Sequence, residues 1–182
     1  TDLDNYIHIK APSRSEANVL KKHAGRNDDE LGAKVAPPTG TAFTIQDDYV
    51  RISNLIIETN DGNGIDVSAS SVSDNAQFIF KDNIIKGSGQ DNTYGIYINE
   101  TLISGQVSNN LIYGYTGVNS TGLYVSADNF YVYQNTFLNN GTGAHNLGTN
   151  YFKNNISSGS SANDYDGTYS AARDYNNLSS DA

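Results

Sequence analysis

The chain has 182 residues and a formal net charge of −9, from 20 acidic and 11 basic residues, and it contains no Cys, Met or Trp. This charge makes it a poor binder of nucleic acid, and no apolar run approaches the roughly 20 residues that membrane insertion requires. Without Cys it has neither disulfides nor thiolate metal sites. Although only 37% of the residues are hydrophobic, 10% are aromatic, which argues against disorder and predicts an ordered, β-rich domain with a thin core.

Residues 1–39 are predicted to be an N-terminal strand followed by a capping or docking segment. The stretch NYIHIKAP (5–12) predicts a strand, and Ser13 with Glu16 forms a capping box for a short helix that Gly25 would end. Five of the eleven basic residues lie here, at Lys10, Arg14, Lys21, Lys22 and Arg26. The segment is expected either to cover the open end of the next domain as a solvated cap or to dock on an acidic neighbour, such as another copy.

Residues 40–182 repeat a motif in which Asn precedes a pair of residues at the start of a strand. It occurs at Asn54, Asn83, Asn110, Asn135, Asn155 and Asn177, in steps of 29, 27, 25, 20 and 22 residues. Before four of these Asn residues stands a Gly that opens a strand with alternating sides, in GIDV (64–67), GIYI (95–98), GLYV (122–125) and GAHN (143–146). Other β-rich segments are YVRI (49–52), QFIF (77–80), GQV (105–107), FYVY (130–133) and NYF (150–152). Three short strands per repeat predict an all-β fold, a right-handed parallel β-helix of about six coils.

The repeated Asn residues are predicted to form a ladder along one corner of the solenoid. Equivalent residues of stacked coils lie about 4.8 Å apart, so a turn Asn can donate a hydrogen bond to the Asn of the next coil while tolerating a left-handed backbone. The best-aligned members are Asn83, Asn110, Asn135 and Asn155. Asn54 is one residue out of step, because Ile52 lies two residues before it and the matching residues of the other repeats lie three before theirs. The alternative is that these Asn residues only form turns.

Several stretches resemble the right-handed β-helix repeats of the pectate-lyase-like superfamily. They are GTAFTIQDDYVRISNLIIET (40–59), NNLIYGYTG, YQNTFLNNGTG and FKNNISSG. The resemblance is strongest to repeat proteins of environmental bacterial surfaces and of phage tails and capsids. It implies a fold and not an activity, because members include polysaccharide lyases, hydrolases, tailspikes and adhesins. The last repeat, DYNNLSSDA, is followed by no apolar cap, so the chain is expected to be an excerpt of a longer protein or to be closed by a partner.

Aligning the coils predicts a stripe of outward residues on one face. Its members are Thr44, Asp66, Tyr97, Tyr124 and His145. Tyr113, Tyr115, Tyr131 and Tyr133 add aromatic residues on adjacent parts of the repeat. Three interpretations stay open for these rings: packing between coils, contact with a protein partner, and stacking on sugar rings. The predicted partner-binding or ligand-binding residues are Tyr97, Tyr124, Tyr113 and Tyr115.

The chain shows no strong catalytic pattern. Asp66, Tyr124 and His145 on the stripe are the candidate catalytic residues of the enzymatic alternative, and Asp47 with Asp48 lies in a turn where Asp is expected anyway. The stretches NDGNGID (60–66) and NDYDG (163–167) have the oxygen-rich spacing of weak calcium loops, but turn chemistry explains both. No cofactor is therefore predicted.

The sequence favours a non-enzymatic structural or adhesive β-helix module of a phage particle or bacterial surface. It would be extracellular, on a cell surface or on a virion, and it would form a homo-oligomer or join a larger assembly. Polysaccharide is a further predicted partner, whereas nucleic acid and membrane insertion are not expected. The enzymatic alternative is a polysaccharide lyase or glycoside hydrolase that acts on an acidic polysaccharide.

Overall fold

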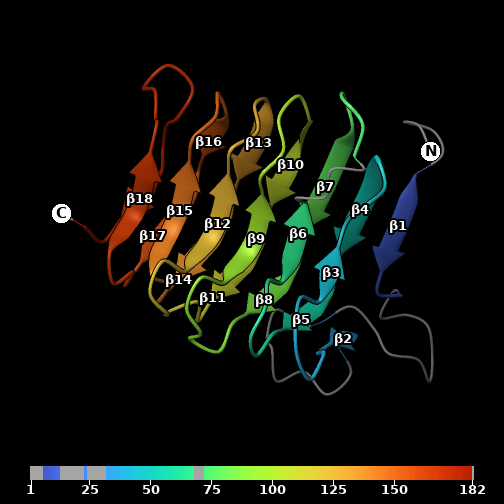
Figure 1. Ribbon diagram of the computed structural model, residues 1–182. Helices are drawn as coiled ribbons and strands as arrows, with labels where there is room; N and C mark the ends of the chain where they lie inside the picture. Colours follow the sequence, from blue (N-terminus) through green and yellow to red (C-terminus); the bar gives the residue numbers. More distant parts are fainter. Residues whose placement is uncertain (1–5, 13–22, 24–31, 68–71, 182) are drawn as a thin grey trace.

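The computed structural model describes residues 6–12, 23, 32–67 and 72–181, and these residues form three parallel sheets (Figure 1). The first sheet contains β1 (Ile7–Lys10), β4 (Tyr49–Ser53), β7 (Gln77–Lys81), β10 (Ser104–Ser108), β13 (Phe130–Tyr133) and β16 (Tyr151–Lys153). The second contains β2 (Lys34–Val35), β5 (Ile56–Glu58), β8 (Ile84–Lys86), β11 (Leu111–Tyr113), β14 (Thr136–Leu138), β17 (Ile156–Ser158) and β19 (Leu178–Ser179). The third contains β3 (Phe43–Thr44), β6 (Ile65–Val67), β9 (Tyr94–Ile98), β12 (Thr121–Val125), β15 (Thr142–Asn146) and β18 (Asn163–Gly167).

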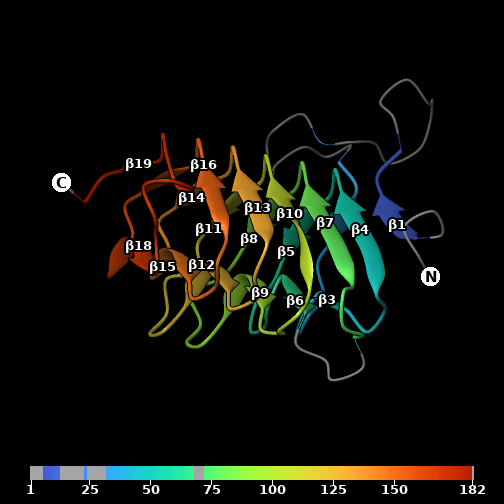
Figure 2. The ribbon, with the colours of Figure 1, turned by 90° about the horizontal axis from the view of Figure 1, so that it is seen from above.

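The chain visits each sheet once per coil, and every strand pairs in parallel with the strands of the coils next to it. In the first sheet, for example, Val107 pairs with Phe80 on one side and with Val132 on the other. Figure 2 shows the strands of this sheet side by side from β1 to β16. The fold is the predicted right-handed parallel β-helix of about six coils, with three short strands in each.

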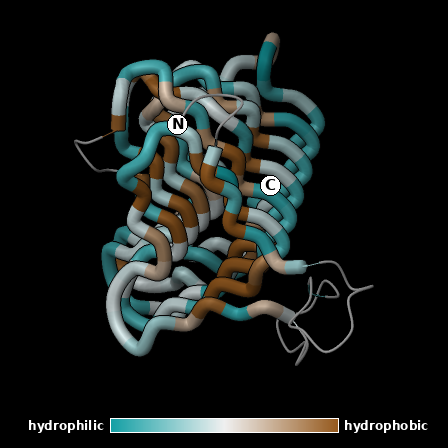
Figure 3. Tube along the Cα trace, turned by 90° about the vertical axis from the view of Figure 1, so that its right-hand side faces the viewer, coloured by the Kyte–Doolittle hydropathy of each residue, from teal (hydrophilic) through white to brown (hydrophobic). Residues whose placement is uncertain are grey.

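The core is a column of apolar side chains that runs along the axis of the solenoid. Figure 3 shows hydrophobic positions of the trace following one another from coil to coil. Alternation within each short strand sends every second side chain inward, and register places like residues above one another. One such row is Ile52, Phe80, Val107, Val132 and Phe152, all completely buried. Each contributes roughly 1.5 to 3 kcal/mol to the free energy of unfolding, which is how a chain with so few hydrophobic residues holds a core.

The N-terminal strand is confirmed as β1, and it pairs with β4 from Ile7↔Val50 to Lys10↔Ser53. The strand β2 pairs with β5 in the same way, so both elements belong to the first coil. The predicted capping helix around Ser13, Glu16 and Gly25, together with four of the basic residues of this segment, lies outside the described residues.

The asparagine ladder is confirmed from Asn83 to Asn177. In each step the Nδ2 atom of one Asn donates to the Oδ1 atom of the Asn in the next coil, at 3.0 to 3.1 Å, and the backbone N–H donates to the same oxygen. The other Nδ2 hydrogen reaches back to a carbonyl of the preceding coil, such as Phe80 O for Asn110 at 2.9 Å. The ladder thereby satisfies the polar groups of a corner where Asn83, Asn110 and Asn135 are buried.

Asn54 is not a rung of this ladder, and the prediction that placed it there is corrected. The rung position of its coil is taken by Leu55, whose N–H donates to Asn83 Oδ1 at 3.1 Å. Asn54 instead has a left-handed backbone, with a φ of 62°. The residues that precede the rungs in other coils share this conformation, such as Asp82 at 58° and Asn109 at 53°. The sequence predicted that one Asn would have the left-handed backbone and also form the ladder. In the structure, the first residue of the corner has the left-handed backbone and the second forms the ladder.

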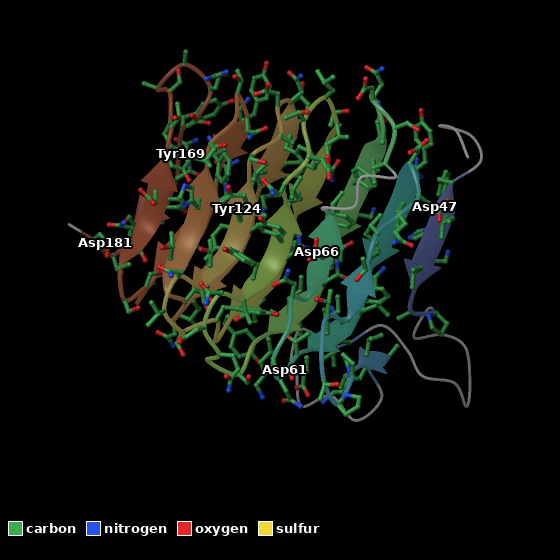
Figure 4. The ribbon with its side chains drawn as sticks, viewed as in Figure 1. Asp47, Asp61, Asp66, Tyr124, Tyr169 and Asp181 are labelled. Carbon is green, nitrogen blue, oxygen red and sulfur yellow. The ribbon has the colours of Figure 1, made fainter. Side chains whose placement is uncertain are left out.

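Two tyrosines cover the core at the C-terminal coils, a feature that the sequence did not reveal. The ring of Tyr169 packs edge-on against Phe152, with 5.2 Å between centroids, and its hydroxyl donates to Ala144 O at 3.1 Å. Tyr165 packs against Tyr169 with 5.9 Å between centroids. Figure 4 places Tyr169 near this end of the stack. The apolar cover therefore comes from residues upstream of the final repeat.

A buried carboxylate, Asp164 in β18, ties the last strand to the solenoid. It accepts hydrogen bonds from the hydroxyls of Ser157 at 3.1 Å, Ser179 at 3.0 Å and Ser180 at 2.8 Å, and from the backbone N–H of Asp181 at 3.2 Å. Burial raises the pKa of Asp164, but the hydrogen bonds from Ser180 and Ser179 outweigh this effect and lower the pKa to about 2.

We expect Asp164 to make the fold sensitive to acid. Because its pKa in the folded state lies below the value of 3.8 for an unperturbed Asp side chain, the carboxylate stabilises the fold above about pH 4, and this stabilisation disappears as the pH falls through about 2. It amounts to about 2 kcal/mol, and the Asp164→Asn variant should lack it. Urea unfolding at a series of pH values measures the difference. Asp91→Asn, which alters one exposed turn, is the control; equal pH dependence in the parent and in Asp164→Asn would contradict the prediction.

Candidate functional site

An open groove of about 340 Å³ lies on the outer face of the first sheet. It crosses β1, β4, β7, β10 and β13, a distance of about 19 Å at the usual spacing of strands. The side chains at its surface come from Tyr6, Tyr49, Arg51, Gln77, Ile79, Ser104, Gln106, Asn129 and Tyr131. Coil stacking places outward residues next to one another on neighbouring strands, but these residues differ in size. The groove forms where smaller side chains lie between larger ones.

Each end of the groove is formed by a tyrosine whose ring is held by another side chain. At one end, the guanidinium carbon of Arg51 lies 3.4 Å from the ring centroid of Tyr6, a cation–π contact. At the other end, the rings of Tyr131 and Tyr151 are stacked at 4.8 Å with 6° between their planes. Tyr131 remains 51% exposed. Each end of the groove therefore offers an aromatic ring in a fixed position.

The groove between these rings combines uncharged polar side chains with a larger apolar surface. Gln77 and Gln106 come from neighbouring strands, and Ser104 and Asn129 add further hydrogen-bonding groups. Gln106 donates from Nε2 to Ser108 Oγ at 2.7 Å, which orients its amide. Amide, hydroxyl and guanidinium groups beside aromatic rings form a lining that can hold a polar ligand with apolar faces.

The predicted stripe on the third sheet is a single column of register-paired residues. Thr44 pairs with Asp66, Asp66 with Tyr97, Tyr97 with Tyr124 and Tyr124 with His145. The structure adds Tyr94, whose ring lies 4.4 Å from Tyr97 and 5.7 Å from Tyr124, and Tyr97 lies 5.0 Å from Tyr124. We call Tyr94, Tyr97 and Tyr124 the tyrosine cluster. Figure 4 shows Asp66 and Tyr124 on this sheet.

The tyrosine cluster is half-buried, and the pKa values of two of its hydroxyls, those of Tyr94 and Tyr97, are raised. Burial raises the pKa of Tyr97, and the neighbouring Tyr94, Tyr124 and Asp66 raise it further. Burial also raises the pKa of Tyr94. Asp66 itself accepts a hydrogen bond of 2.7 Å from Asn63 Nδ2. The cluster thus packs neighbouring coils together, as one of the open interpretations proposed, and still presents ring edges and hydroxyls to solvent.

The stripe continues into an acid–imidazole pair that the sequence did not predict. His145 Nδ1 lies 3.3 Å from Asp166 Oδ2, and the His145 ring lies 5.3 Å from the Tyr124 ring. Asp166 is the register partner of His145 in β18. It was missed because NDYDG was considered as a calcium loop and not as a strand of the next coil.

The four tyrosines next to the stripe occupy different places. Tyr131 lines the groove, Tyr133 is half-buried on the first sheet, and Tyr113 is half-buried on the second sheet. Tyr115 is completely buried in the core, where its hydroxyl lies 3.0 Å from Thr59 Oγ1. The prediction that Tyr115 binds a partner is therefore wrong, because no part of its side chain reaches the surface.

The carboxylates of the described residues are not arranged as a facing pair on the stripe. Asp66 and Asp166 share one column but are four strand spacings apart, about 19 Å, whereas glycosidase carboxylates lie about 5 to 9.5 Å apart. Asp48 accepts a hydrogen bond of 2.7 Å from the N–H of Ser73, and this bond lowers its pKa. Figure 4 shows Asp47 toward the β1 end, away from Asp66. The Asp48 carboxylate therefore accepts a backbone hydrogen bond and has a structural role.

The two candidate calcium loops use their oxygens within the fold. In 60–66, the Asp61 carboxylate accepts the N–H of Gly40, and Asn63 Oδ1 accepts the N–H of Tyr94 at 2.9 Å. In 163–167, Asp164 is buried and Asp166 faces His145. Within the described ranges, no group of three or more His, Cys, Asp or Glu side chains is arranged to hold a metal ion, and no helix could span a membrane.

Comparison of the chain with protein-family models, with curated proteins and with solved structures found no match.

Proposed function

We propose that this chain is a non-enzymatic, adhesive β-helix module that binds glycans in the groove of the first sheet. The observation that carries the proposal is the lining of the groove, where Tyr6 and Tyr131 stand at the ends of a row of amide and hydroxyl groups. Sugar rings have apolar faces that stack on aromatic rings and hydroxyls that bond to amides. A length of about 19 Å suits an oligosaccharide better than a single sugar.

The proposal places the chain among the pectate-lyase-like β-helix proteins of bacterial surfaces and phage particles. The repeat motifs around Asn54 to Asn177 support this assignment, as does a solenoid tied together by side-chain ladders. Such a rod holds its binding face in one shape, which suits adhesion. In this setting the module is extracellular and works as part of a homo-oligomer or a larger assembly, with the tyrosine cluster as the contact for a neighbouring protein.

Binding to an array of oligosaccharides, followed by calorimetry with the best ligand, tests the proposal. Replacing Tyr131 by Ala is expected to weaken binding at least about tenfold, because a stacking surface at the groove end is lost. Tyr124→Ala is the matched control, since Tyr124 lies in the tyrosine cluster on another sheet and should leave glycan affinity unchanged.

Two results would overturn glycan binding in the groove. One is equal loss of affinity in Tyr131→Ala and Tyr124→Ala when both variants keep the thermal stability of the parent. The other is the absence of binding to every glycan of the array at millimolar concentration.

A second candidate function is a lyase acting on an acidic polysaccharide, and the pairing of His145 with Asp166 favours it. His145 would remove the proton next to the uronate carboxyl, and Tyr124 would protonate the leaving oxygen as the C–O bond breaks and a C=C bond forms. Release of unsaturated ends by the parent, lost in His145→Ala, would establish this candidate. Turnover that survives His145→Ala would exclude this site.

A further inference from the structure

The charges of the solenoid are segregated between its faces. The six strands of the first sheet contain Lys10, Arg51, Lys81 and Lys153 but no Asp or Glu. On the third sheet, the outward charged residues of the strands are Asp66 and Asp166, and its six strands contain no Lys or Arg. In a chain with a net charge of −9, the face that carries the groove is thus the cationic one.

Two of these cations, Arg51 and Lys81, meet in a second, smaller hollow of about 110 Å³, which we call the anion hollow. It is lined by His8, Arg51, Ser53, Ile79, Lys81 and Gln106. Three of these residues, Arg51, Ile79 and Gln106, also line the groove, so the two hollows are continuous.

The groups around the anion hollow are held in place without an ion pair to a carboxylate of the described residues. Arg51 rests on the ring of Tyr6, and His8 Nε2 lies 2.9 Å from Ser53 Oγ. Guanidinium and ammonium groups that face one small hollow attract an anion, and they bind it more strongly where the surface is partly shielded from water.

We propose that the anion hollow binds the carboxylate or sulfate group of an acidic sugar residue whose ring lies in the groove. Arg51 supplies a planar pair of donors, Lys81 a point charge, and Gln106 an amide to the adjoining hydroxyls. This inference rests on the proposed glycan binding and specifies its ligand as an anionic oligosaccharide.

His8 provides a built-in reporter of the charge in the anion hollow. Burial lowers the pKa of His8, and the charges of Lys10, Arg51 and Lys81 lower it further. An anion in the hollow offsets these positive charges, so its binding raises the pKa of His8. A neutral sugar in the groove leaves those charges uncompensated.

The test follows the His8 imidazole by NMR during pH titrations of the intact chain with four probes. Sodium glucuronate and glucose 6-sulfate represent the two anions, methyl glucuronate is the neutral match of the first, and a thymidine oligonucleotide represents phosphate. Both anionic sugars are expected to raise the pKa of His8 by about half a unit or more, and methyl glucuronate should leave it unchanged. If only one of the two anionic sugars raises the pKa of His8, that result shows whether the hollow prefers a carboxylate or a sulfate group.

Matched variants locate the response. Arg51→Gln and Lys81→Gln are each expected to weaken glucuronate binding about tenfold, whereas Lys153→Gln, on the same sheet but outside both hollows, should bind as the parent does. Equal effects of glucuronate and its methyl ester on His8 would overturn the proposal, as would equal losses in Lys153→Gln and Arg51→Gln. Tighter binding of the oligonucleotide than of either anionic sugar would overturn it in favour of a nucleic-acid partner.

The same measurements separate this inference from the proposed function. If Tyr131→Ala weakens glycan binding but the affinity does not depend on the charge of the sugar, the proposal of an anion hollow is wrong and the proposal of glycan binding in the groove is supported. If anionic sugars shift His8 while Tyr131→Ala changes no sugar affinity, the anion hollow stands without the groove.

Discussion

Replacing Asn110 by Leu is expected to lower the free energy of unfolding by about 3 kcal/mol. Asn110 is buried, its Oδ1 accepts from the backbone N–H and the Nδ2 of Asn83, and its Nδ2 donates to Phe80 O and Asn135 Oδ1. Leu fills a similar volume but removes these hydrogen bonds from the buried corner, and the backbone N–H of Asn83 loses its acceptor. Urea unfolding followed by circular dichroism measures the loss.

The residue next to this rung supplies the control. Asn109 is exposed and has a φ of 53°, so Asn109→Gly keeps the backbone conformation and removes no rung. We expect this variant to lie within about 0.5 kcal/mol of the parent. Equal unfolding midpoints for Asn110→Leu and the parent would show that the ladder contributes nothing to stability.

Replacing Tyr115 by Ala should have the largest effect of any single core substitution proposed here, about 4 kcal/mol. The ring is completely buried, and it fills space left by glycines of other coils: a Cβ atom on Gly87 would lie 2.8 Å from the ring. Ala at position 115 leaves a cavity that the rigid coils cannot close.

The Tyr115→Phe variant separates the ring from the hydroxyl. It retains the packing but removes the contact with Thr59 Oγ1 at 3.0 Å, so we expect a loss of about 1 to 2 kcal/mol. Thermal unfolding of the two variants and the parent tests the order. A Tyr115→Ala variant as stable as Tyr115→Phe would refute the packing role of the ring.

The coils and the ladder could be predicted from the sequence because both depend on short, local patterns. Alternation within GIYI and GLYV fixes which residues face outward, and coil stacking then brings Tyr97 and Tyr124 together. The burial of Tyr115 could not be predicted in this way, because Tyr115 follows the end of β11 and lies outside the alternating pattern of the strand. The space for its ring comes from Gly64 and Gly87, which lie far from it in the sequence.

The groove could not be predicted because its parts belong to separate regions of the chain. Tyr6 and His8 lie in the predicted N-terminal strand, and only the pairing of β1 with β4 brings them beside Arg51. In the sequence, Arg51 belongs to the β-rich segment YVRI (49–52), which lies far from Tyr6 and His8 along the chain. Charge segregation was equally hidden, since outward residues become a face only when the register of all the coils is known.

From β4 onward, the corner between the first and second sheets contains two residues, as in Asp82-Asn83 and Asn109-Asn110. The other two corners vary in length. Between the second and third sheets, the segment from β8 to β9 spans 87–93 and that from β14 to β15 only 139–141. Between the third and first sheets, the segment from β3 to β4 spans 45–48 and that from β9 to β10 spans 99–103. Insertions and deletions during evolution should therefore accumulate at these two corners, while the two-residue corner, which holds the ladder, stays constant in length. Divergent relatives of this chain should then be recognised better by that recurring pair than by overall sequence identity, and foreign loops should be grafted most safely at the two variable corners.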